Sequence, residues 1–197
     1  MAFHWQTFRT RALTAVVFVA VMLAGLFGNH WTFLLLFYII HFGCWWEYFR
    51  LLEKIYTTTF HIYIKLGLML AGYGLMLRLC PDLYVLAGYS VKHSLPLVMS
   101  IAGFVLTGMG IFQRTAIIPK AFAVIVLGLA YISLSWGLMM HLYGEREFNF
   151  PDHQYVFVSY FIPACIIASI WINDTMAYIV GSLIGITPLS RVSPKKT

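Results

Sequence analysis

Residues 171–197 read WINDTMAYIVGSLIGITPLSRVSPKKT, and this stretch combines an apolar membrane segment with most of what the chain indicates about its function. A single acid, Asp174, interrupts an apolar run that is otherwise typical of a membrane helix, and two lysines, Lys195 and Lys196, stand near its end. Ionisable side chains at membrane depth are costly and usually mark functional sites. Asp174 is therefore the first candidate for a functional residue, and the lysine pair supplies the charge that an anionic ligand needs.

The composition is that of an integral membrane protein. Apolar residues make up 61% of the 197 residues and charged residues only 10%, whereas soluble domains carry roughly 25% charged residues. We expect an all-α, polytopic fold in which residues 1–197 form a single membrane domain of about six transmembrane helices. The predicted segments are 12–28, 31–46, 62–79, 95–112, 120–143 and 155–186. The first is too long for a cleaved signal peptide and is expected to remain as a span.

Two stretches between these segments are expected not to span. Residues 47–61 mix charged and aromatic side chains, which favours an amphipathic helix at the membrane surface. Residues 81–93 are too short to cross and predict an interfacial loop or a short re-entrant piece. The fourth and fifth segments begin beside Pro96 and Pro119, a residue tolerated in the first turn of a helix.

The distribution of basic residues orients the predicted bundle. With the N-terminus in the cytoplasm, ten of the thirteen lysines and arginines fall on the cytoplasmic side, as the positive-inside rule requires. These ten are Arg9, Arg11, Arg50, Lys54, Lys65, Arg114, Lys120, Arg191, Lys195 and Lys196, and the other side keeps Arg78, Lys92 and Arg146. The net charge of +6 thus indicates a basic face for anionic headgroups or solutes. Nucleic acid is not an expected partner, because no clustered solvated basic patch is present.

Cysteine and histidine spacing gives no sign of a metal or redox site. The three cysteines, Cys44, Cys80 and Cys165, are far apart and form no CxxC pair. The seven histidines show neither HxxxH nor HExxH spacing. We therefore assign none of these residues to chemistry.

The polar residues of the sixth segment are spaced to share one side of a helix. Asp174 and Tyr178 are one turn apart, and Gly181 and Gly185 follow at i+7 and i+11. The carboxylate of Asp174, the phenol of Tyr178 and the space left by the two glycines could therefore form one wall of a polar cleft. Because the apolar pattern continues past the length of one crossing, the helix must tilt, break near Asn173 and Asp174, or project into a cytoplasmic cavity.

Each feature also has a purely structural interpretation. Asp174 could pair with Lys65, with Arg78 or with a partner subunit. A GxxxG pair such as Gly181 and Gly185 is more often a helix-packing site than a ligand site. Basic residues after a span are the expected cytoplasmic anchor.

The order of the motifs favours function. W-x-x-D-T-x-A-Y occupies residues 171–178, a glycine step follows at Gly181 and Gly185, and S-P-K-K-T occupies residues 193–197. In this the stretch resembles bacterial phosphatidate cytidylyltransferases, also called CDP-diacylglycerol synthases. The rest of the chain resembles the family more loosely, at an arginine pair before the first span, at Trp46-Glu47-Tyr48 followed by Arg50-Leu51, and at Gly128 and Tyr131.

The resemblance implies a reaction of phospholipid biosynthesis in the bacterial inner membrane, with the N-terminus cytoplasmic. The phosphate of phosphatidic acid would attack the α-phosphorus of CTP, giving CDP-diacylglycerol and pyrophosphate, with Mg²⁺ as cofactor. Asp174, Lys195 and Lys196 are the expected catalytic residues, and Asp174 is a candidate metal ligand. Substrate contacts are expected from Asn173, Tyr178, Ser193, Lys195, Lys196 and Thr197. A homodimer in contact with membrane lipids is an open possibility.

The chain departs from the family pattern in two places. Ser182 stands where the family often has an arginine, which puts a phosphate contact in doubt. The sequence also stops at Thr197, inside the second motif. The resemblance thus implies the N-terminal part of such an enzyme, with the main metal ligands further along and with this part alone inactive.

Three other classes of protein remain open from the sequence. A small multi-span transporter would usually show paired hydrophobic halves or discontinuous helices, and we see neither. A CTP-dependent lipid or polyprenol kinase would transfer the γ-phosphate of CTP instead of CMP. A non-catalytic membrane scaffold is the third alternative.

Overall fold

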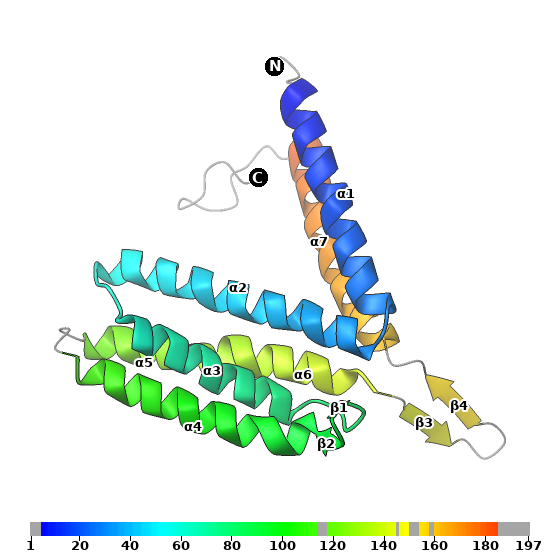
Figure 1. Ribbon diagram of the computed structural model, residues 1–197. Helices are drawn as coiled ribbons and strands as arrows, with labels where there is room; N and C mark the ends of the chain where they lie inside the picture. The colour runs from blue at the N-terminus through cyan, green and yellow to red at the C-terminus, as the bar shows by residue number, and fades with distance from the viewer. Residues whose placement is uncertain (1–4, 114–117, 145, 150–153, 158–159, 185–197) are drawn as a thin grey trace. The chain divides into compact units, whose positions relative to one another are not determined.

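The fold consists of long apolar helices joined by short connections. The computed structural model describes residues 5–113, 118–144, 146–149, 154–157 and 160–184 (Figure 1). The helices are α1 (Trp5–Phe27), α2 (His30–Tyr56), α3 (Ile62–Arg78), α4 (Val91–Ile111), α5 (Pro119–Gly128), η1 (Leu129–Leu134), α6 (Ser135–Leu142) and α7 (Phe161–Ile184). Because α5, the π-helix η1 and α6 follow one another without a break, the described residues form six helical rods. The all-α prediction is confirmed.

Two small hairpins interrupt the helices. β1 (Val85–Leu86) pairs with β2 (Tyr89–Ser90), and β3 (Arg146–Asn149) pairs with β4 (Gln154–Phe157), both antiparallel. The first hairpin turns at Ala87 and Gly88, whose φ angles of 50° and 85° suit a two-residue turn. The predicted non-spanning stretch thus contains this hairpin up to Ser90, whereas its last residues, 91–93, belong to helix α4. The prediction that the sixth segment starts at residue 155 is wrong, because β4 precedes a helix that begins at Phe161.

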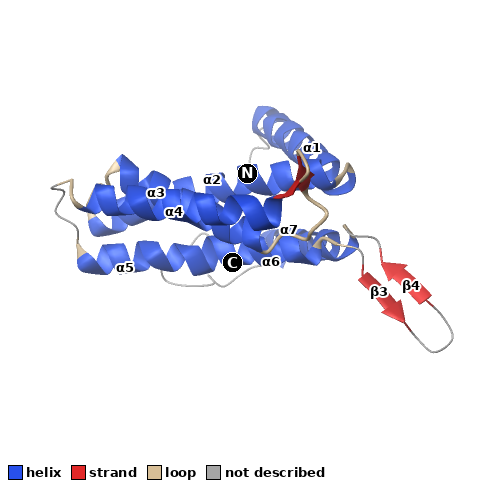
Figure 2. Ribbon diagram, turned by 60° about the horizontal axis from the view of Figure 1, so that its bottom comes forward, coloured by secondary structure: helices blue, strands red, loops and turns tan. Residues whose placement is uncertain are grey.

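The chain divides into two compact units, Met1–Tyr160 and Phe161–Thr197. In the first unit α2, α3, α4 and the α5–η1–α6 rod lie side by side and alternate in direction (Figures 1 and 2). The second unit contains α7. The core of the first unit is a cluster of buried side chains around the middle of the bundle, including Trp45, Phe49, Ile64, Ile125 and Ile132.

Helix α2 is longer than the sequence pattern suggests. Asn29 caps its start through a reciprocal pair of hydrogen bonds with Thr32, and it ends at Thr57, whose φ of 49° is left-handed. The predicted surface helix at residues 47–61 is wrong, because residues up to Tyr56 continue α2. The physical reason is core packing, since Phe49 and Leu52 are buried among the helices of the bundle.

Helices α3 and α4 approach each other closely at glycines. A Cβ atom on Gly103 would lie 2.5 Å from both Ala71 N and Gly67 O. Small residues of this kind allow helix backbones to come together in membranes. Helix α4 begins at Val91 and contains Pro96 within it, so it starts earlier than predicted, whereas Pro119 opens α5 as expected.

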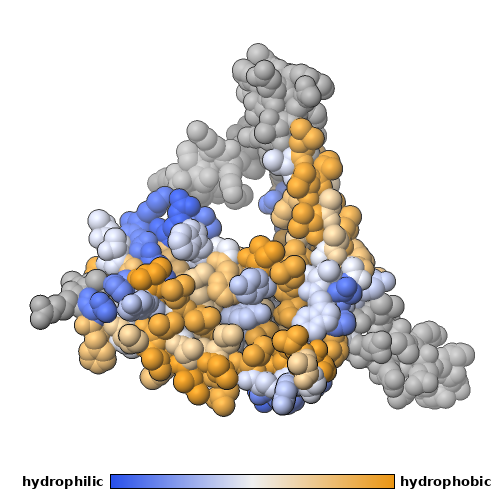
Figure 3. Space-filling view, in the orientation of Figure 1, coloured by the Kyte–Doolittle hydropathy of each residue, from blue (hydrophilic) through white to orange (hydrophobic). Residues whose placement is uncertain are grey.

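Four helices are long and apolar enough to cross a membrane, judged over the residues that the structure describes: His30–Tyr56, Val91–Ile111, Pro119–Leu142 and Phe161–Gly181. Figure 3 shows hydrophobic residues over the side of the bundle and hydrophilic residues gathered towards its ends. At one end lie Lys54 in the last turn of α2, Lys65 in the first turn of α3 and Lys120 at the start of α5. The chain is therefore an integral membrane protein.

Candidate functional site

Helix α7 carries Asn173 and Asp174 without a break. It is α-helical from Phe161 to Ile184, and the hydroxyl of Ser169 donates to the carbonyl of Cys165 over 2.7 Å within it. Of the three expectations for this helix, a break near Asn173 and Asp174 is excluded. Asp174 lies roughly 20 Å along the helix from its first residue, at 1.5 Å per residue.

Asn173 and Asp174 are consecutive residues of this span, and both are exposed. Consecutive residues of an α-helix differ by about 100° in direction, so the two side chains leave adjacent sides of α7. Asp174 is also the only acid in residues 161–197. The helix thus presents one carboxylate and one amide oxygen from a candidate membrane span.

The remaining predicted site residues lie outside the part of α7 whose side chains the structure describes. The side chain of Tyr178 lies outside the described part of α7, and Gly185, Ser193, Lys195, Lys196 and Thr197 lie outside the described residues. The expected meeting of Asp174 with the lysine pair therefore stays a prediction.

The side-chain oxygens on α7 suit a magnesium ion whose remaining ligands come from the substrate and from water. Over the part of the chain that the structure describes, no group of three His, Cys, Asp or Glu side chains could enclose a metal. Mg²⁺, however, is usually held by one or two carboxylates together with substrate phosphates and water. Asp174 could supply the protein carboxylate of such a site, and Asn173 lies next to it in the sequence.

One structural alternative for Asp174 loses support. Lys65 lies 2.8 Å from Glu53 Oε1, and both side chains are about four-fifths buried, at 19% and 20% exposure. The same carboxylate oxygen accepts the backbone N–H of Phe60 over 2.8 Å. Glu53 and Lys65 thus hold the α2–α3 connection, and Lys65 already has an acidic partner.

Comparison with known proteins identifies the class of this chain. A sequence model described as the cytidylyltransferase family matches residues 9–197. The chain belongs to this cytidylyltransferase family. It is the family of phosphatidate cytidylyltransferases, as the motifs at residues 171–197 predicted. Searches of curated proteins and of solved structures give no match.

Membership of the cytidylyltransferase family establishes the general chemistry. The protein is a nucleotidyltransferase that uses CTP. The four candidate spans among its described residues indicate that this cytidylyltransferase is an integral membrane protein.

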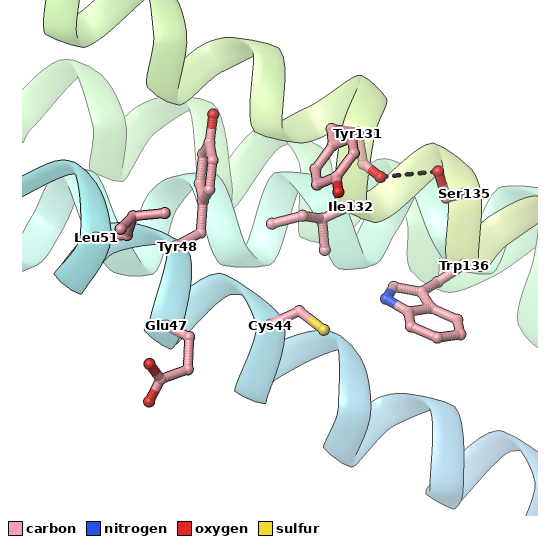
Figure 4. Close-up of a pocket in the computed structure, with 8 residues that line it drawn as sticks. All are labelled: Cys44, Glu47, Tyr48, Leu51, Tyr131, Ile132, Ser135 and Trp136. Carbon is pink, nitrogen blue, oxygen red and sulfur yellow. Dashed lines mark hydrogen bonds between the residues drawn. The ribbon is translucent and has the colours of Figure 1, made fainter. Parts of the chain in front are cut away.

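A groove in the first unit brings together the looser sequence matches. Its volume is about 580 Å³, and Figure 4 shows its lining from α2 on one side and from η1 and α6 on the other. The lining residues are Cys44, Glu47, Tyr48, Leu51, Tyr131, Ile132, Ser135 and Trp136. Glu47, Tyr48, Leu51 and Tyr131 belong to the two short motifs noted in the sequence, and the fold places these motifs on opposite walls.

Close contacts between α2 and α5 shape this groove. A Cβ atom on Gly128 would lie 2.8 Å from Tyr48 and 2.9 Å from Trp45, so only glycine fits there without a shift. The hydroxyl of Tyr48 donates to the carbonyl of Val124 over 2.7 Å. The π-helix η1 follows directly, and such wide turns are frequent at functional sites. Within the Gly-x-x-Tyr step of this cytidylyltransferase, Gly128 is therefore a helix-packing residue, whereas Tyr131 is exposed and lines the groove.

Sequence reasoning missed a buried polar cluster between α2 and η1. His41 and Ser133 are both fully buried, and His41 Nε2 lies 3.0 Å from Ser133 Oγ. Trp45 Nε1 donates to the same oxygen over 3.0 Å. His41 and Trp45 lie one turn apart on α2, but Ser133 comes 92 and 88 residues after them, so spacing along the chain gave no signal for this cluster.

Proposed function

We propose that the chain transfers CMP from CTP to phosphatidic acid, giving CDP-diacylglycerol and pyrophosphate in phospholipid biosynthesis. A phosphate oxygen of the lipid forms a bond to the α-phosphorus of CTP. The bond between that phosphorus and the oxygen bridging to the β-phosphate breaks, and its electrons leave with pyrophosphate. Family membership supports the use of CTP, and the apolar spans support a substrate whose acyl chains remain in the bilayer.

The exposed pair on α7 is the observation that carries this proposal. Asp174 would hold Mg²⁺ through its carboxylate, and Asn173 is a second candidate on the same turn. When bound, the ion neutralises charge on the triphosphate as it develops. A continuous α7 keeps the two side chains at a fixed spacing, which matters because phosphoryl transfer depends mainly on positioning and charge.

The residues that follow α7 would bind the nucleotide. Lys195 and Lys196 would donate charge-assisted hydrogen bonds to triphosphate oxygens, with Ser193 and Thr197 adding hydroxyl donors. Tyr178, one turn beyond Asp174, would contact the substrate from the same side of the helix. The cytoplasmic face of a bacterial inner membrane supplies both CTP and the lipid phosphate.

Labelled CTP tests which group is transferred. The full-length protein in phosphatidic acid micelles receives CTP labelled at either the α- or the γ-phosphate, and the lipid extract is counted. We expect the α-label to enter lipid and the γ-label to leave in pyrophosphate. Entry of the γ-label into lipid would show a lipid kinase. Entry of neither label would favour the transporter or the scaffold.

A further inference from the structure

The groove beside η1 lies at the surface of the first unit. It lies between α2 and the α5–η1–α6 rod, and both are candidate membrane spans. Tyr131 and Leu51, two of its lining residues, have exposed fractions of 75% and 54%. Its volume of about 580 Å³ falls within the ~300–1,000 Å³ usual for ligand pockets. In a membrane, this space is accessible to lipid chains.

One end of the groove carries positive charge. Glu47 lines the groove, and Arg50 Nη1 lies 3.2 Å from Glu47 Oε1, so the guanidinium stands at the rim. Lys54 follows one turn later, in the last turn of α2. The charges of Arg50 and Glu47 cancel each other. The charge of Lys54 therefore makes this end of the groove positive. The other lining residues are mainly apolar and aromatic.

We propose that this groove binds one acyl chain of an anionic glycerophospholipid, with its phosphate at Arg50 and Lys54. The charge at one end matches a headgroup. The lining on α2 runs from Cys44 to Leu51, about 10 Å at 1.5 Å per residue, so the groove accommodates the part of a lipid tail nearest the headgroup. A neighbouring helix fits less well, because membrane helices meet at small residues. The groove is bordered instead by the large side chains of Tyr48, Tyr131 and Trp136. This inference goes beyond the proposed function and does not depend on it.

Tryptophan fluorescence tests the groove directly, because Trp136 lines it. The full-length protein is placed in phosphatidylcholine bilayers with a small, fixed fraction of lipid carrying brominated chains, which quench nearby indoles. The brominated lipid is either phosphatidylglycerol, which is anionic and not the proposed substrate, or phosphatidylcholine. The fluorescence of Trp136 is obtained by subtracting the emission of the Trp136→Phe variant from that of the wild type.

We expect brominated phosphatidylglycerol to occupy the groove roughly fivefold more than brominated phosphatidylcholine, which is the effect of about one basic residue near a lipid headgroup. The double variant Arg50→Gln with Lys54→Gln should abolish the preference. Arg78→Gln should leave it intact, because Arg78 is in the last turn of α3, at the end of the bundle opposite to Lys54. Trp46 is 52% exposed on α2 outside the groove, so it should show no preference. If the double variant does not fold, high salt should weaken the preference in the wild type.

Two results would overturn the proposal. Equal quenching of Trp136 by both brominated lipids would show contact with bulk lipid only. Absence of Trp136 quenching, with Trp46 still quenched, would show that protein covers the groove, either a second copy or another helix of the chain.

Discussion

The indole N–H of Trp45 donates to Ser133 Oγ over 3.0 Å, and this bond joins α2 to the π-helix η1 in the buried centre of the bundle. His41 Nε2 lies 3.0 Å from the same oxygen. Gly72 on α3 leaves room for it, because a Cβ at that position would collide with Ser133 Oγ. Three helical rods therefore meet at one hydroxyl group.

Ser133→Ala should destabilise the bundle. The change leaves Trp45 Nε1 and His41 Nε2 without their shared partner at a buried site. The expected loss is about 0.6–2 kcal/mol, the range for interhelical hydrogen bonds in membrane proteins. Thermal unfolding in detergent measures it. Ser135→Ala is the matched control, since that exposed hydroxyl bonds only within its own rod, to the carbonyl of Tyr131. Equal melting temperatures for the two variants would contradict a structural role for Ser133.

Gly103→Ala should force α3 and α4 apart. The added methyl group would lie 2.5 Å from the backbone of both Ala71 and Gly67, and backbone atoms cannot move aside cheaply. Overpacking of this kind costs about 1–3 kcal/mol. Gly108→Ala on the same helix meets nothing within 4 Å, so it should be neutral. The melting temperatures of both variants measure this effect. A Gly103→Ala variant as stable as the wild type would show that α3 and α4 do not pack as closely as the contacts at Gly103 indicate.

The loop before α4 should loosen in acid. The hydrogen bond and charge of Lys92, with a further contribution from His93, hold the pKa of Asp82 below its ordinary value. A carboxyl whose pKa is lower in the folded state stabilises the fold above its unfolded pKa, and this stabilisation is lost as the pH falls through the folded pKa. Hydrogen exchange at Val85–Ser90, corrected for intrinsic rates, should therefore speed up below the ordinary aspartate range. Asp82→Asn should remove this pH dependence, and an unchanged pH profile in the variant would refute the assignment.

Lys195→Ala with Lys196→Ala should weaken the binding of CTP. Hydrogen bonds to charged groups contribute about 1.5–3 kcal/mol each, so the Michaelis constant for CTP should rise at least about tenfold. Steady-state kinetics of the full-length protein measure this, with Lys120→Ala on α5 as the control. Wild-type kinetics in the double variant would remove both lysines from the nucleotide site.

The sequence predicted the helices better than their ends. Long apolar runs specify where helices form, but side-chain packing decides where they stop. Phe49 and Leu52 carry α2 past the charged residues that suggested a separate surface helix. Ala87 and Gly88 allow a hairpin in the stretch that was predicted as an interfacial loop or a short re-entrant piece.

The candidate site residues and the buried polar contacts also differ in how far the sequence predicts them. Asp174 and Asn173 could be found from the sequence because an acid in an apolar run is conspicuous by itself. The His41–Ser133 contact joins residues 92 positions apart, so it becomes visible only when the helices are packed. The groove lined by Tyr48 and Tyr131 likewise needs the π-helix, and no local pattern in residues 129–134 predicted one.

Asp174→Asn is the most direct test of the role assigned to α7. The substitution preserves size and removes the charge that would hold Mg²⁺. We measure incorporation of α-labelled CTP into phosphatidic acid by the full-length protein, as a function of Mg²⁺, beside Ser169→Ala on the same helix. We predict that CMP transfer by Asp174→Asn falls at least about hundredfold and needs more Mg²⁺, while Ser169→Ala behaves as wild type. Transfer by Asp174→Asn at the wild-type rate and Mg²⁺ requirement would contradict the account.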